Sequence, residues 1–256
     1  MKLTNKSYWE SAHKATGKAT LLKRLFRFRE EKIISKLIQK YIPQGDYSKQ
    51  VIEIGCYPGE YLRILEKHGY NINGIDFIDS SAKMHSSFKN DNLHVTEIIQ
   101  ADFLEHQFSK KYDVVMSFGF VEHFNDYIDI IDRHCNLVED GGYLLITAPN
   151  YRVGLQKKMI SFFDSHEAME TLVLESMNPK EWETAVANND FQILFCGYFG
   201  LPRIVRGYKG ALIKRAIFLM ILIFLRAIRF IPLLFESQSG AFSSNIGIVA
   251  RKRDSI

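Results

Sequence analysis

The chain has 256 residues, of which 46% are hydrophobic, 24% charged and 13% aromatic. This composition is typical of a globular protein, and it excludes a disordered tail, a collagen-like fibre and a small disulfide scaffold. The three cysteines, Cys56, Cys135 and Cys196, lie far apart without a CxxC pair, so they support neither a disulfide framework nor a zinc ribbon. We therefore expect no metal site and a reducing, cytoplasmic compartment, in keeping with an N-terminus that has no signal-peptide-like apolar run.

The charge is distributed unevenly. Residues 1–46 hold eleven Lys and Arg against four Asp and Glu, and residues 201–256 hold ten against two, whereas the middle of the chain is acidic. Such basic flanks predict contact with a polyanion, either a nucleic acid or an anionic membrane surface. Solvated helix faces are the simpler alternative.

The first predicted element is a basic amphipathic helix over residues 20–41, which ends before the Pro43–Gly45 turn. From residue 49 to 148, short apolar runs then alternate with helix-like stretches. The predicted strands cover residues 51–55, 71–76, 95–99, 112–118 and 143–148. This alternation predicts a parallel sheet with crossover helices.

The last third is less regular. Residues 150–178 show no strong period, and residues 179–190 read as a helix that begins at Pro179. Two further strands are predicted at 191–199 and 245–252, separated by forty-five residues, far more than a hairpin needs.

The clearest motif is the run from Glu53 to Gly59, in which a strand is followed by a turn with glycines at 55 and 59. Glycine lets the backbone turn tightly and approach a ligand. The loop also lies at the carboxyl end of the first predicted strand, where open α/β sheets bind ligands. The GxxxG spacing differs from the dinucleotide pattern GxGxxG, so an ordinary strand-to-helix turn is the alternative.

Two acidic residues follow later strands. Asp76 closes the second strand, twenty-one residues after Gly55, where a carboxylate can accept both hydroxyls of a ribose. Asp102 and Phe103 follow the third strand and offer an acceptor for an exocyclic amine and a ring that stacks on a base.

Taken together, these motifs resemble the class I methyltransferases that use S-adenosylmethionine, and among them the small-molecule group related to the quinone-biosynthesis enzymes. The resemblance covers about residues 47–150. It is carried by Glu53–Gly59, Asp76, Ala101–Asp102, Tyr112–Val115, Glu122–His123 and Glu139–Gly142.

The resemblance implies an α/β, Rossmann-like, doubly wound seven-stranded sheet whose last strand is antiparallel. Together with the charge and apolar patterns, it leads us to expect a basic helical lid region at 1–46, a methyltransferase domain at 47–200 and 245–256, and a basic hydrophobic helical insertion at 201–244.

The resemblance also implies site roles. The loop from Glu53 to Gly59 would bind the methionine part of S-adenosylmethionine. The end of the second strand would bind its ribose, and the residues after the third strand its adenine. The segment from Ser117 to His123 would lie near its sulfonium. The implied cofactor-binding residues are Glu53, Gly55, Cys56, Tyr57, Gly59, Asp76, Phe77, Asp102, Phe103, Ser117 and Phe118. The family usually has a further glycine where Tyr57 stands, so this loop is bulkier here.

Methyl transfer mainly requires alignment of acceptor and methyl group and removal of a proton, and no metal is needed in principle. His123 is the candidate base, since imidazole titrates near neutrality. A helix-start histidine bonded to backbone is the alternative, and we expect Glu122 to shape the loop rather than carry chemistry. His166 is a second, weaker candidate base, and Tyr8–Trp9 resembles an aromatic pair on a lid over the cofactor.

Residues 210–235 are the most apolar part of the chain. The longest uncharged run, Ala216 to Leu225, has ten residues, too few for the roughly 20 of a spanning helix. With Arg226 and Arg229 close by, we expect a helix that lies in the plane of an anionic membrane, and a buried helix in a homodimer is the alternative.

The sequence therefore predicts a cytoplasmic methyltransferase, peripheral on the inner membrane face, that O-methylates a hydroxyl of a lipid-linked glycan or similar amphiphile. A quinone-type phenol or soluble metabolite is the alternative acceptor. A non-catalytic, membrane-attached binding protein of the same fold and an RNA-modifying enzyme are alternative functions, although a nucleic-acid partner would leave the apolar run unexplained.

Overall fold

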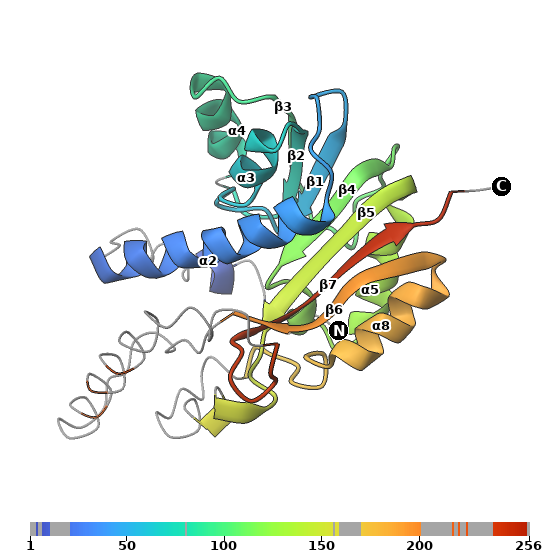
Figure 1. Ribbon diagram of the computed structural model, residues 1–256. Helices are drawn as coiled ribbons and strands as arrows, with labels where there is room; N and C mark the ends of the chain where they lie inside the picture. The colour runs from blue at the N-terminus through green and yellow to red at the C-terminus, as the bar shows by residue number, and fades with distance from the viewer. Residues whose placement is uncertain are drawn as a thin grey trace.

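The computed structural model describes residues 4, 7–10, 21–79, 81–155, 157–158, 170–200, 217, 220, 224 and 238–254. Seven strands form one sheet (Figure 1): β1 Gln50–Ile54, β2 Asn71–Asp76, β3 Val95–Gln100, β4 Tyr112–Phe118, β5 Val138–Pro149, β6 Phe191–Phe199 and β7 Asn245–Lys252. The described residues include the helices α2 Leu21–Tyr41, α3 Leu62–Lys67, α4 Ser81–Asn90, the 3₁₀ turn η1 Val121–His123, α5 Tyr127–Asn136 and α8 Pro179–Asn188.

The strand order is β3-β2-β1-β4-β5-β7-β6. The first five strands pair in parallel, and β7 runs antiparallel to both β5 and β6. The predicted doubly wound sheet with an antiparallel last strand is therefore confirmed, and each predicted strand is present.

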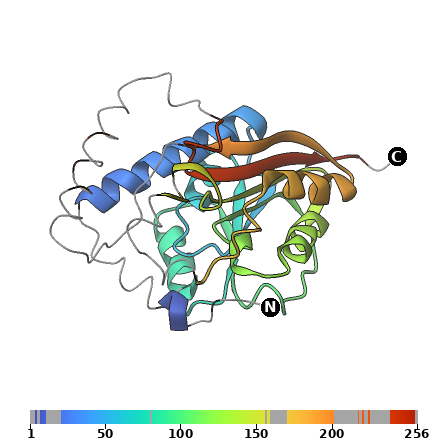
Figure 2. The same ribbon diagram turned by 90° about the horizontal axis from the view of Figure 1, so that it is seen from below.

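Alternation of side chains along the strands explains why helices cover both faces. Ile52 and Ile54 of β1 join the apolar core under α5 and α8, whereas Val51, which precedes Ile52, joins the core under α2, α3 and α4. Figure 2 shows α5 and α8 side by side on their face of the sheet. Trp182 of α8 is fully buried there and donates from Nε1 to the Ser176 carbonyl at 2.6 Å.

On the opposite face, α2 contributes the buried residues Ile34 and Ile38, and Ile42, directly after the helix, continues their four-residue spacing. The exposed residues Lys32, Lys36 and Lys40 lie at the same spacing, so α2 has the expected basic amphipathic character over its second half.

The strand order reverses between β1 and β4, because the chain moves outward from β1 to β2 and β3 and then returns to the other side of β1. In open α/β sheets, the crevice at such a switch point, outside the carboxyl ends of the strands, is where ligands bind. The fold thus places the loops after β1 and β4 side by side at the expected edge.

Candidate active site

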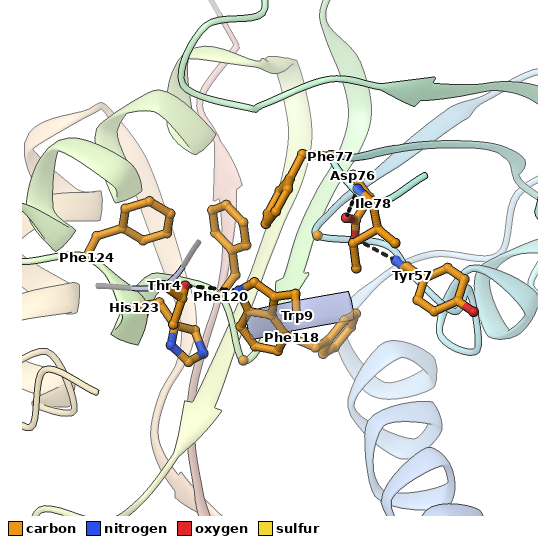
Figure 3. A pocket seen from close by; sticks show the side chains of 12 residues that line it. Thr4, Trp9, Tyr57, Asp76, Phe77, Ile78, Phe118, Phe120, His123 and Phe124 are labelled. Carbon is orange, nitrogen blue, oxygen red and sulfur yellow. Dashed lines mark hydrogen bonds between the residues drawn. The ribbon is translucent and has the colours of Figure 1, made fainter. Parts of the chain in front are cut away.

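A cavity of about 170 Å³ lies at this switch point. Its walls come from the loops after β1, β2 and β4, from η1 and from the N-terminal segment (Figure 3). The lining residues are Thr4, Trp9, Gly55, Tyr57, Asp76, Phe77, Ile78, Phe118, Gly119, Phe120, His123 and Phe124.

Gly55 and Asp76 form the floor of the cavity on the β1–β2 side. Gly55 has a φ of 72°, and a Cβ atom there would come within 2.8 Å of the Phe120 ring, so only glycine fits. The Asp76 carboxylate accepts hydrogen bonds from the backbone N–H groups of Tyr57 and Ile78, each at 3.0 Å. The carboxylate also lines the cavity, and a carboxylate is an acceptor suited to the hydroxyls of a ribose.

Glu53 lies one layer beneath the cavity. Its side chain is 2% exposed, and its Oε2 atom has no hydrogen-bond partner among the described residues. Burial, together with the nearby Asp76 carboxylate, raises the pKa of Glu53 well above its usual value. An adjacent cation would favour the ionised form, and S-adenosylmethionine carries positive charge on its sulfonium and its ammonium group. The residues at this end of the cavity therefore fit that cofactor.

The other predicted cofactor residues lie around the cavity rather than in the wall formed by the described residues. Cys56 is buried against Gly74, and burial raises the pKa of its thiol well above the usual value. Gly59 faces α4, since a Cβ there would clash with Phe88 and Met84.

Beyond β3, Asp102 accepts the backbone N–H of Leu104, and Phe103 is 6% exposed in the core. Ser117 is fully buried, and its hydroxyl has no hydrogen-bond partner within the described ranges. Gly55, Tyr57, Asp76, Phe77, Phe118 and His123 are the predicted residues that the fold brings together in the cavity wall.

His123 stands at the end of η1 and is 7% exposed. Its Nδ1 lies 2.7 Å from the carbonyl oxygen of Thr171. Because a carbonyl only accepts, Nδ1 carries the proton in the neutral ring, and Nε2 is left with its lone pair. The neighbouring backbone is held by the same segment, since the N–H of Val173 donates to the carbonyl of Glu122 at 2.8 Å. This arrangement suits a general base.

In the aromatic pair Tyr8–Trp9, Trp9 lines the cavity from the N-terminal side and contacts the Tyr8 ring. The Trp9 ring contacts the His123 ring at a centroid distance of 4.9 Å, edge to face, and Trp9 Nε1 donates to Thr4 Oγ1 at 2.9 Å. Tyr8 reaches Thr171 Oγ1 at 3.4 Å. The pair therefore lies over the candidate base. His166 and nearly all of residues 210–235 lie outside the described residues.

Several wall residues were not predicted individually. Phe120 and Phe124 complete an aromatic wall with ring centroids 5.0 Å apart, and Ile78 follows the β2 loop. The resemblance covered the segment up to His123, but an apolar ring within it carries no signal that separates a ligand contact from a core residue. Thr171 is 48 residues from His123, so their contact depends on the fold.

Two general tests apply to the described part of the chain. It contains no group of three or more His, Cys, Asp and Glu side chains arranged to hold a metal ion. Among the same residues, no helix combines the length and apolar character needed to span a membrane.

Sequence comparison finds relatives that match about half of the chain. Over 135 residues, 52% of this chain, it is 27% identical to the ubiquinone biosynthesis O-methyltransferase of Rickettsia felis, covering 54% of that protein. The namesake from Actinobacillus pleuropneumoniae is 26% identical over 132 residues, 48% of this chain and 56% of the relative. The chain spans about half the length of the curated relatives it matches.

Structure comparison extends the likeness to nearly the whole chain. Magnesium protoporphyrin IX methyltransferase from Synechocystis, with S-adenosylhomocysteine bound, has a TM-score of 0.61 at 12% identity, covering 97% of this chain and 95% of that one. Coclaurine N-methyltransferase, bound to N-methylheliamine and S-adenosylhomocysteine, has a TM-score of 0.58 at 12% identity, with coverages of 92% and 75%.

These likenesses support the expected fold, and the ligands in the two structures are those of enzymes that use S-adenosylmethionine. A family model described as a methyltransferase domain matches residues 25–194, about two thirds of the chain. The chain therefore belongs to the methyltransferase-domain family, and the class I, S-adenosylmethionine-dependent type expected from its sequence is confirmed.

Proposed function

We propose that the protein is an S-adenosylmethionine-dependent O-methyltransferase acting on a hydroxyl of an amphiphilic molecule at the cytoplasmic face of a membrane. The observation that carries the proposal is His123: it lines the same cavity as Gly55 and Asp76, and Thr171 holds its Nδ1–H so that Nε2 can accept a proton. A base in that position is what a hydroxyl acceptor needs.

The bound cofactor would supply a methyl group already activated by positive sulfur. Gly55 and Asp76 hold the cofactor, and the aromatic wall excludes water. His123 Nε2 removes the proton of the acceptor hydroxyl as its oxygen attacks the methyl group. The relatives named O-methyltransferases favour oxygen over nitrogen as the methylated atom.

The acceptor class is supported by the wall itself. Trp9, Phe118, Phe120 and Phe124 line the cavity together with His123, and these apolar rings suit a molecule with an apolar body and one hydroxyl at the reacting end. A lipid-linked glycan and a quinone-type phenol both meet this description. The phenol is the second candidate, and it is supported by the relatives named ubiquinone biosynthesis O-methyltransferase.

The membrane location rests on charge and exposure. Residues 201–256 carry ten basic against two acidic residues. Within the apolar run, Met220 and Phe224 are 61% and 64% exposed and lie one helical turn apart. Exposed apolar side chains flanked by Arg and Lys are typical of helices that lie on anionic membranes.

The proposal is tested with S-adenosylmethionine carrying a deuterated methyl group and two acceptors, an alkylated catechol and a polyprenyl-linked sugar, with and without anionic vesicles. We expect label on an acceptor oxygen, at a rate that vesicles increase. Binding of the cofactor without transfer to either hydroxyl would instead favour the non-catalytic binding protein, and transfer to an amine would contradict O-methylation.

Vesicle sedimentation tests the membrane location separately. We expect Met220→Asp combined with Phe224→Asp to reduce the bound fraction. Ile128→Asp on α5 is the matched control, since Ile128 is also an exposed apolar residue, at 37%. Equal binding by the wild-type protein, the double variant and the control variant would contradict docking through residues 210–235.

A further inference from the structure

Glu122 is the acidic neighbour of the candidate base. Glu122 and His123 are consecutive in η1 and are 2% and 7% exposed. The carboxylate atom Oε1 lies 4.0 Å from Nε2 of His123, the ring nitrogen that Thr171 does not engage. The same oxygen would lie 3.3 Å from a Cβ at Gly119, whose φ is 68°, so the turn brings the backbone close to the carboxylate.

We infer that Glu122 is a positioning residue whose carboxylate stabilises the imidazolium that His123 becomes when it takes the acceptor proton. The inference rests on the proposed function and revises the expectation that Glu122 only shapes its loop. The charge forms at Nε2, 4.0 Å from Oε1, in a site where both side chains are almost fully buried. Opposite charges at that separation interact more strongly there than in water.

Other groups also face this ring. Trp9 covers it edge to face from the N-terminal segment, and Thr171 contributes a carbonyl oxygen from the segment before α8. Asp76 and Tyr57 line the same cavity from the β2 and β1 loops and are titratable, and Tyr8 reaches Thr171 through its hydroxyl. Asp76 acts in the same direction as Glu122, so a variant must change Glu122 alone.

The test is Glu122→Gln, which keeps the size of the side chain and removes its charge. Loss of a neighbouring negative charge lowers the pKa of a histidine, so we expect the His123 pKa, measured by NMR titration, to fall by about one unit or more. The limb of the pH–rate profile that requires deprotonated His123 moves to lower pH by the same amount, while the plateau rate falls.

Glu66→Gln is a matched control. Glu66 is also buried, at 7% exposure, and its Oε1 lies 3.0 Å from Nδ1 of His94. We expect this variant, which removes a buried carboxylate away from the cavity, to leave the titration of His123 unchanged. If Glu122→Gln fails to fold, Glu122→Asp keeps the charge on a shorter side chain, and His123 should then titrate close to its wild-type value.

An unchanged His123 pKa in folded Glu122→Gln overturns the inference, because a purely structural role would lower the rate without moving the titration. The NMR measurement needs no acceptor, so it separates the two claims. A shifted His123 pKa without methylation of any hydroxyl would support the role of Glu122 and contradict the proposed function. Methylation that depends on His123 but not on the charge of Glu122 would support the proposed function and contradict the role of Glu122.

Discussion

Replacement of Asp76 by Ala should weaken cofactor binding by about 100-fold. Two ribose hydroxyls would donate to this carboxylate, and a hydrogen bond to a charged group contributes about 1.5 kcal/mol at the lower end of its range. The loss is then about 3 kcal/mol, and each 1.4 kcal/mol corresponds to a tenfold change in affinity. Calorimetric titration with S-adenosylhomocysteine measures this change directly.

The same substitution removes the acceptor for the N–H groups of Tyr57 and Ile78. At about 1.5 kcal/mol for each hydrogen bond to this charged group, the free energy of unfolding should fall by about 3 kcal/mol. Asp79→Ala is the control, because Asp79 is exposed and accepts a hydrogen bond from the Gln100 side chain. A folded Asp76→Ala protein with the wild-type dissociation constant would refute the ribose placement.

Three further substitutions test the site and the fold. His123→Ala should lower turnover by about 10²-fold or more with cofactor affinity almost unchanged, and an undiminished rate would return His123 to a structural role. Gly55→Ala forces a Cβ against Phe120 at a φ of 72°, so thermal unfolding should show a loss of at least about 1 kcal/mol. Burial lowers the pKa of His134 from 6.5 to about 4. As the pH falls from 6.5 to about 4, the unfolded chain is therefore protonated at His134 before the folded protein is, and the free energy of unfolding decreases by up to about 3 kcal/mol. Urea unfolding at pH 7.5 and 5 should show a smaller pH dependence in His134→Leu, and an equal dependence would contradict this assignment.

The strands could be predicted because each is a short apolar run between turn residues. The main difference is β5, which begins at Val138 rather than at residue 143. Val138 pairs with Tyr112, and the next pair, Val114 with Tyr143, follows an irregularity in register. Gly141, at a φ of 74°, lies within this stretch, and sequence alone reads an acidic, glycine-containing segment as a turn.

The placement of candidate site residues could be predicted where a motif depends on the local backbone. Gly55 follows β1 and Asp76 is the last residue of the neighbouring parallel strand β2, so the topology alone brings them to one edge of the sheet. Side-chain direction was harder to predict. Cys56 lies beside Gly55 in the sequence, yet it packs against Gly74 within the core.

The contacts of His123 with Trp9 and Thr171 were also beyond prediction from the sequence. They join segments more than forty residues apart, and no local pattern encodes such a pairing. The expected lid pair is present at the cavity, but its position over His123 could be learned only from the fold.

Calorimetric titration of the purified protein with S-adenosylhomocysteine tests the central claim most directly. The account predicts binding of one molecule per chain with a micromolar dissociation constant, weakened by Asp76→Ala and retained by His123→Ala. Absence of binding at millimolar concentration by the folded protein would contradict it.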